Sequence, residues 1–159
     1  HEEGDQMSQV RAKLAELGLE LPIAAKPIAA YVPAVRTGNL VFTAGQLPLV
    51  DGKISITGKV GGAVTVEQAK ALAQVCALNC LGAVATVADI DDIVKIVRVV
   101  GYVNGVPGFI NQPAVVNGVS ELFLHIWGEA GKHARSAVGI AELPMDSPVE
   151  VELTVELRS

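Results

Sequence analysis

The clearest hydrophobic pattern in the chain lies near its C-terminal end, from Val149 to Arg158. Valine and leucine occupy every odd position up to Leu157, and four of the five even positions are charged. A period of two residues predicts a β-strand with one buried and one polar face. Four other segments, rich in β-branched or alternating apolar residues, are also predicted to be strands: 31–36, 40–46, 93–103 and 134–143.

Local signals refine these strands. The first two are joined by Gly38-Asn39, a dipeptide typical of a hairpin turn. In the long third strand, strict alternation places Lys95 and Arg98 on opposite faces of the sheet. Gly45 interrupts the strand that follows the hairpin turn, which indicates that another group approaches the backbone closely at this position.

Three segments carry the apolar period of an amphipathic helix: 8–18, 65–87 and 111–131. The second begins with a capping box, in which Thr65 is followed three residues later by Gln68. The third begins with Asn111, a favourable N-cap residue, and has Pro113 in its first turn. Asn79 lies beside the apolar stripe of the second helix, and we interpret it as a partner for backbone groups rather than for a ligand.

The predicted order of elements is helix, strand, strand, helix, strand, helix, strand, strand. Two long helices and five strands favour an α/β protein of the α+β two-layer type, with both helices on one face of the sheet and an extra N-terminal helix. The apolar residues of the central strands favour coverage of the other face by another subunit, and hence an oligomer. Residues 1–6 precede Met7 and are interpreted as an expression remnant, so residues 7–159 are expected to form a single domain.

Composition narrows the classes of partner. The formal net charge of −5 argues against binding to nucleic acid, because no broad cationic surface is available for phosphate. The sequence has neither a membrane span nor a signal pattern, so we expect a cytoplasmic protein that does not bind membranes.

Cys76 and Cys80 lie four residues apart within a predicted helix, where a disulfide would be strained, and are interpreted as core residues. Two thiols without a nearby His or Cys partner are poor metal ligands, and the glycine-rich loop 58–62 lacks the Lys-Ser/Thr of a phosphate loop, so neither segment is predicted to bind a metal or a phosphate.

Arg135 is the first candidate for ligand binding. Ala137 and Gly139 share its face of the predicted strand, which leaves an open groove beside the guanidinium. Such a groove suits bidentate binding of a carboxylate. The alternative is an ion pair between Arg135 and an acidic residue of the last strand, and the spacing alone leaves both possibilities open.

Glu150 is the second candidate. It comes early in the last strand, one short turn after the strand of Arg135, so these two strands are predicted to pair as a hairpin. Its carboxylate is suited to ordering a water molecule for catalysis. Alternatively it belongs, with Glu152 and Glu156, to a solvated or subunit-facing surface. The histidines show neither a Ser-His-Asp order nor a metal-ligand spacing, so no catalytic set is predicted from them.

Three stretches resemble one known family. They are Val-Phe-Thr-Ala-Gly-Gln-Leu-Pro at 41–48, His-Ala-Arg-Ser-Ala-Val-Gly-Ile-Ala-Glu-Leu-Pro at 133–144, and Val-Glu-Val-Glu at 149–152. These motifs, in this order, resemble the Rid family, also called YjgF-like or endoribonuclease L-PSP. The resemblance implies a chorismate-mutase-like fold with a mixed sheet, and a homotrimer with ligand clefts between its subunits.

The resemblance also implies an activity and a set of site residues. The best-studied members hydrolyse enamine and imine intermediates, such as 2-aminoacrylate, to 2-keto acids and ammonia, without a metal or organic cofactor. The family's carboxylate-binding arginine falls on Arg135 and its water-associated glutamate on Glu150, which are the implied catalytic residues. The implied substrate-binding residues are Tyr31, Gly45, Asn117, Arg135, Ser136 and Ala137.

Two departures indicate a divergent branch of the family. Ala137 stands where active deaminases often have cysteine, and Ala-Ala-Tyr-Val-Pro-Ala-Val at 29–35 replaces the usual Gly-Pro-Tyr-Ser-Gln. Three functions therefore remain open. The first is a hydrolase similar to 2-iminobutanoate/2-iminopropanoate deaminase. The second is a non-catalytic protein that binds a small carboxylate or keto acid in the same cleft, and the third, which the acidic charge disfavours, is an endoribonuclease.

Overall fold

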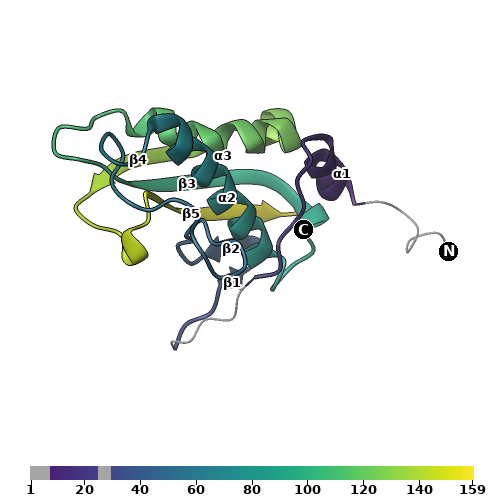
Figure 1. The fold of residues 1–159 in the computed structure, drawn as a ribbon. Coiled ribbons are helices and arrows are strands. Elements are labelled where there is room, and N and C mark those ends of the chain that lie inside the picture. Colours follow the sequence, from purple (N-terminus) through teal and green to yellow (C-terminus); the bar gives the residue numbers. More distant parts are fainter. Residues whose placement is uncertain (1–7, 25–29) are drawn as a thin grey trace.

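The computed structural model describes residues 8–24 and 30–159. Residues 1–6, which we interpret as an expression remnant, lie outside these ranges. Residues 25–29, part of a Pro- and Ala-rich segment, also lie outside them. The helices are α1 (Gln9–Glu16), α2 (Val66–Val84) and α3 (Gln112–Trp127), and the strands are β1 (Ala34–Thr37), β2 (Leu40–Thr43), β3 (Ile93–Asn104), β4 (Ala134–Ile140) and β5 (Val149–Leu157). Their order along the chain is the predicted one (Figure 1).

The five strands form one mixed sheet in the order β1-β2-β5-β3-β4. All neighbouring pairs are antiparallel except β3 and β4, which are parallel and are connected through α3. The prediction that the strands of Arg135 and Glu150 pair as a hairpin is wrong. After the parallel crossover β4 lies at the sheet edge, and β5, whose apolar face is fully buried, pairs on both sides between β2 and β3.

The prediction for Lys95 and Arg98 is also wrong, because both lie on the same face of the sheet. The register between β3 and β5 shifts twice, between Ile93 and Lys95 and again between Ile96 and Arg98. Each irregularity adds a residue and breaks the alternation. The two cations therefore lie beside Glu156 and Thr154 on the polar face of β5.

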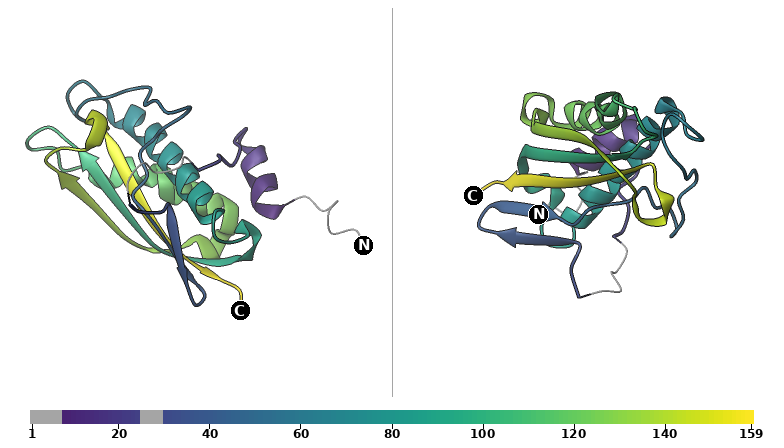
Figure 2. Two further views of the ribbon diagram at one scale, coloured as in Figure 1. Left: turned by 90° about the horizontal axis from the view of Figure 1, so that it is seen from below. Right: turned by 90° about the vertical axis from the view of Figure 1, so that its left-hand side faces the viewer.

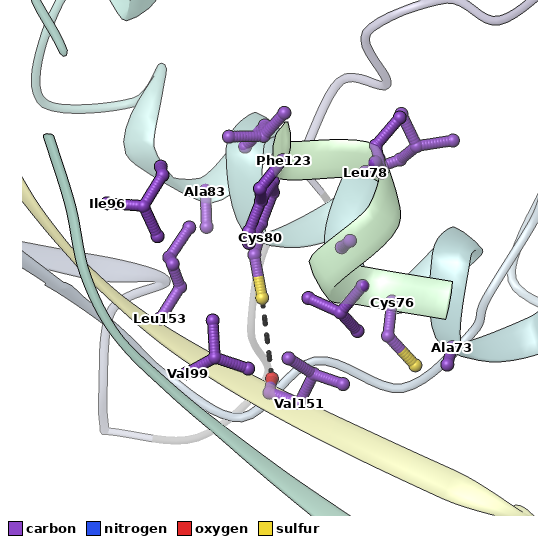
Figure 3. Close-up of a cluster of buried hydrophobic side chains, with 14 of the residues drawn as sticks. Ala73, Cys76, Leu78, Cys80, Ala83, Ile96, Val99, Phe123, Val151 and Leu153 are labelled. Atoms are coloured by element: carbon purple, nitrogen blue, oxygen red, sulfur yellow. Dashed lines mark hydrogen bonds between the residues drawn. The ribbon is translucent and has the colours of Figure 1, made fainter. Parts of the chain in front are cut away.

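Helices α2 and α3 cover one face of the sheet, and the core lies between the two layers (Figure 2). Figure 3 shows part of this core, in which Cys76 and Cys80 are both free and fully buried. The Cys80 thiol donates to the carbonyl oxygen of Val151 over 3.4 Å. Burial raises the pKa of Cys80 to about 12, so it stays a thiol. The interpretation of both cysteines as core residues is confirmed.

Of the two predicted N-terminal helix caps, one is confirmed in full and the other only in position. Thr65 and Gln68 form the predicted capping box. Asn111 does occupy the N-cap of α3, but its side chain makes no capping hydrogen bond. Asn79 has the predicted structural role, because its Nδ2 donates to the carbonyl oxygens of Leu47 and Leu49 at 2.9 and 3.0 Å. These two hydrogen bonds hold the segment that follows Gly45 against α2.

The second face of the sheet carries no helix in the described part of the chain (Figure 2). Large apolar side chains are exposed on this open face: Val35, Phe42, Val138 and Ile140. Val35 and Phe42 are cross-strand neighbours on β1 and β2, whereas Val138 and Ile140 lie on β4 at the opposite edge of the sheet. Within the described residues, no helix combines the length and apolar character needed to cross a membrane.

Candidate functional site

Arg135 points from edge strand β4 toward α3. Its Nη1 donates to Asn117 Oδ1 at 2.9 Å and to Ser120 Oγ at 3.1 Å. Asn117 and Ser120 are three residues apart, which places them on one face of the helix. Ala137 lies on the same side of β4 as Arg135 and packs against the core. Two predicted binding residues, Arg135 and Asn117, are therefore in direct contact.

The charge of Arg135 is not neutralised by a carboxylate. Among residues 8–24 and 30–159, no acidic side chain forms an ion pair with it. The alternative of an ion pair with the last strand is thus not observed, and β3 separates β4 from β5. Both partners of Nη1 are neutral, and the described residues provide no acceptor for Nε or Nη2. This free edge of the guanidinium matches the geometry of a carboxylate.

A serine and a histidine extend the network behind Arg135. Ser120 Oγ lies 2.8 Å from His133 Nε2, and His133 Nδ1 lies 2.7 Å from the carbonyl oxygen of Gly131. Burial, with a further contribution from the charge of Arg135, lowers the pKa of His133. Neither Ser120 nor His133 is among the site residues predicted from the sequence. The available signals were positional: Ser120 follows Asn117 by three residues, and His133 precedes Arg135 by two.

Glu150 belongs to a second cluster, on the open face of the sheet. Beyond the end of β2, Gln46 pairs with Val151, and this places Gly45 beside Glu150. A Cβ atom at position 45 would lie only 2.0 Å from Glu150 Oε2, so glycine is required there while the carboxylate keeps its position. The close approach predicted at Gly45 is confirmed. A pocket of about 310 Å³ opens here, lined by Gly45, Tyr102, Ile140, Glu142, Leu143, Pro144, Glu150 and Glu152.

The surroundings of Glu150 in this pocket favour the protonated form of its carboxyl group. Partial burial, with the nearby charge of Glu152, raises the pKa of Glu150. Glu152 accepts a hydrogen bond from the Tyr102 hydroxyl, which contributes most to raising the pKa of Tyr102 to about 12. Tyr102 therefore stays neutral and holds Glu152 in place. Within the described structure no side chain donates to the carboxylate of Glu150, which leaves that carboxylate available to a water molecule.

We expect Glu150→Gln to raise the melting temperature at pH 7 by about 2 °C, a small gain because the group is partly exposed. A raised pKa means that the folded state holds this proton more tightly than the unfolded state. Glu150 then favours folding at low pH, and this contribution is lost as the pH rises through the raised pKa. Thermal unfolding at pH 7 and pH 4 measures the effect. An equal gain at both pH values would contradict it.

The two clusters lie on opposite faces of the sheet. Arg135 faces the helices, whereas Glu150 lies on the open face, and β3 runs between their strands. Ser136 is on the open face as well, where its Oγ accepts from Arg98 Nη2 at 3.1 Å. Tyr31 is exposed ahead of β1, at the other end of the strand order from β4. One chain therefore brings together Arg135 with Asn117, and separately Gly45 with Glu150, but not the two sets.

In the described part of the chain, no three side chains of the His, Cys, Asp or Glu types lie close enough together to bind a metal ion.

A family model described as "YjgF/chorismate_mutase-like, putative endoribonuclease" matches residues 11–157. This chain belongs to the YjgF-like family. The family resemblance and the α+β, chorismate-mutase-like fold predicted from the sequence are therefore confirmed.

The YjgF-like chain matches two curated proteins over nearly their whole length. It is 40% identical over 153 residues to Protein TCP17 of Trypanosoma cruzi, covering 95% of this chain and 96% of that protein. It is 29% identical over 141 residues to the 2-iminobutanoate/2-iminopropanoate deaminase of Dermatophagoides farinae, covering 88% of this chain and 95% of that enzyme. Among solved structures, Atu1372 of Agrobacterium tumefaciens, a protein of unknown function, has a TM-score of 0.87 at 42% identity, over 94% of this chain and 93% of that one.

Proposed function

We propose that this YjgF-like chain hydrolyses small 2-imino and enamine acids, such as 2-aminoacrylate, to 2-keto acids and ammonia. The observation that carries the proposal is the guanidinium of Arg135, which two neutral side chains hold at Nη1 and which keeps a free edge. Its charge and geometry suit the carboxylate that every substrate of this class carries. Similarity to a 2-iminobutanoate/2-iminopropanoate deaminase supports the same reaction class.

The reaction needs a fixed substrate and a placed water molecule. Arg135 binds the carboxylate, and Glu150 accepts a hydrogen bond from the water that attacks the imine carbon. An enamine such as 2-aminoacrylate first gains a proton at its terminal carbon and loses one from nitrogen, which gives the imine. Addition of water across the C=N bond then gives a carbinolamine, and cleavage of its C–N bond releases ammonia and leaves the keto group. The raised pKa of Glu150 suits it to take a proton from water and to return one to the departing nitrogen. Positioning the two reactants supplies the larger part of the acceleration.

Since one chain holds Arg135 and Glu150 on opposite faces, the proposed site needs two subunits. We propose a homotrimer, in which Arg135 and Asn117 of one subunit meet Gly45 and Glu150 of the next. The exposed apolar side chains of the open face, including Phe42, provide a surface for this contact. Equilibrium sedimentation measures the oligomeric state.

The activity is tested by producing 2-iminopropionate from alanine with an amino-acid oxidase. We expect the wild-type protein to speed the release of pyruvate and to reduce the trapping of the imine by semicarbazide. Arg135→Ala is expected to lose at least about tenfold in activity, because a charge-assisted hydrogen bond to the carboxylate is removed. Keto-acid binding that depends on Arg135, with no turnover by the wild type, would instead indicate the non-catalytic binding protein.

Mixing two inactive variants tests the shared site. Arg135→Ala and Glu150→Gln are combined, unfolded and refolded together, so that subunits assort at random. A mixed interface that takes its arginine from one variant and its glutamate from the other is complete, so about a quarter of wild-type activity is expected to return. Each variant refolded alone is the control. No recovery in mixtures shown to be co-assembled would contradict a site shared between subunits.

A further inference from the structure

Ser120 and His133 form a hydrogen-bonded chain that ends at Arg135, and the proposed hydrolysis gives His133 no role. In each of these hydrogen bonds, the chemistry of the two groups decides which one donates and which one accepts. The carbonyl oxygen of Gly131 only accepts, so Nδ1 of His133 carries a hydrogen. The guanidinium only donates, so Ser120 Oγ accepts from Arg135 Nη1. In neutral His133 the remaining nitrogen, Nε2, accepts the hydroxyl hydrogen of Ser120.

Protonation of His133 reverses one bond in this chain. Nε2 then donates to Ser120 Oγ, which already accepts from Arg135. The hydroxyl hydrogen of Ser120 is released and has to find another acceptor. The network thus gains a positive charge and a free donor next to the guanidinium, and both favour a bound anion.

Among residues 8–24 and 30–159, no carboxylate pairs with His133. Phe123 of α3 contacts the imidazole edge to face, with ring centroids 6.1 Å apart. The charged neighbours in sequence, Glu129 and Lys132, pair with each other at 2.7 Å in exposed positions. From β4, the charge that acts on His133 is that of Arg135, which repels the protonated imidazole. A carboxylate on Arg135 would neutralise this repulsion.

We propose that a small carboxylate bound at Arg135 is taken up together with a proton on His133, with Ser120 as the link between them. The inference rests on the carboxylate site of the proposed function and extends it to ligands of the 2-keto and 2-imino monocarboxylate class. Coupling between two sites is reciprocal. If protonated His133 strengthens carboxylate binding, the bound carboxylate makes His133 easier to protonate by the same factor.

The test is an NMR titration of the His133 imidazole in the full-length protein, with and without saturating pyruvate. We expect pyruvate to raise the pKa of His133, and its affinity to increase by about fivefold between pH 8 and pH 5.5. In His133→Gln the pyruvate affinity is expected to lose this pH dependence while binding at pH 8 is retained. His125→Gln is the matched control, because His125 pairs with Glu16 of α1 and not with Arg135, and it keeps the pH dependence.

Three results would overturn the inference, and they are distinguishable from failure of the proposed function. Pyruvate that binds without shifting the His133 titration contradicts the coupling while leaving the carboxylate site intact. A pH dependence that persists in His133→Gln assigns the coupled proton to another group, such as Glu150. Failure of pyruvate to bind the wild type at any pH between 5.5 and 8 rejects the carboxylate site itself, and the coupling with it. Turnover is not needed for any of these measurements.

Discussion

Gly45→Ala is expected to reduce the proposed deaminase activity by at least about 100-fold, the scale of loss that follows a misplacement of about 1 Å. The added Cβ would lie 2.0 Å from Glu150 Oε2 and 3.0 Å from Glu150 Cδ. The carboxylate has to leave its position, and with it the proposed water site. Carboxylate binding through Arg135 is expected to remain, because Asn117 and Ser120, and not Glu150, hold the guanidinium in place. Steady-state kinetics and pyruvate binding, measured on the same preparation, separate the two effects.

A double-mutant cycle identifies Glu150 as the cause. In Glu150→Ala the side chain that meets the new Cβ is absent, so the addition of Gly45→Ala is expected to cost little further stability or activity. The two substitutions are therefore expected to be strongly non-additive. Additive losses would show that Gly45 acts through its backbone alone and would remove the link to the carboxylate.

Gly118→Ala is expected to lower the free energy of unfolding by about 3 kcal/mol, near the upper end for overpacking a core. Gly118 is buried in α3 where this helix meets α2, and a Cβ there would lie 2.2 Å from the backbone carbonyl oxygen of Lys70. Backbone cannot rotate aside as a side chain does, so the two helices have to separate. Urea unfolding at a fixed protein concentration measures the loss.

The matched control for this substitution is Gly139→Ala in β4. Its new Cβ would meet only the Nε2 atom of Gln112, at 3.0 Å, which is the far end of a flexible side chain. We expect a loss well below that of Gly118→Ala. Equal losses would mean that the helix contact yields as easily as a side chain.

The class of fold follows from the sequence because the hydrophobic periods are strong. The unbroken alternation of β5 and the capping box at Thr65 are local signals that tertiary contacts do not override. The same holds for the close approach at Gly45, where a strand is interrupted by the one residue without a Cβ. These features need only near neighbours to be interpreted.

Features that depend on strand order were predicted less well. The hairpin between β4 and β5 was inferred from a short connection, but a short connection does not decide which strands pair. The side of Lys95 was misplaced because a register shift leaves no distinct residue type behind. The contact of Ser120 with His133 joins two elements, and only the packing of α3 against the segment before β4 brings them together. The roles of Arg135 and Glu150 in a common site stay predictions until the shared site is tested.

In the proposed site, Arg135 and Glu150 come from two subunits, and this arrangement would link turnover to the total concentration of the chain. A lone protomer carries every residue of the proposed site and yet holds no complete copy of it. If the site is shared in this way, dilution is expected to reduce activity without changing any residue. A substitution at Val35 or Phe42 that weakens the contact between subunits would be scored in an assay as a catalytic defect, although neither side chain touches a reacting atom.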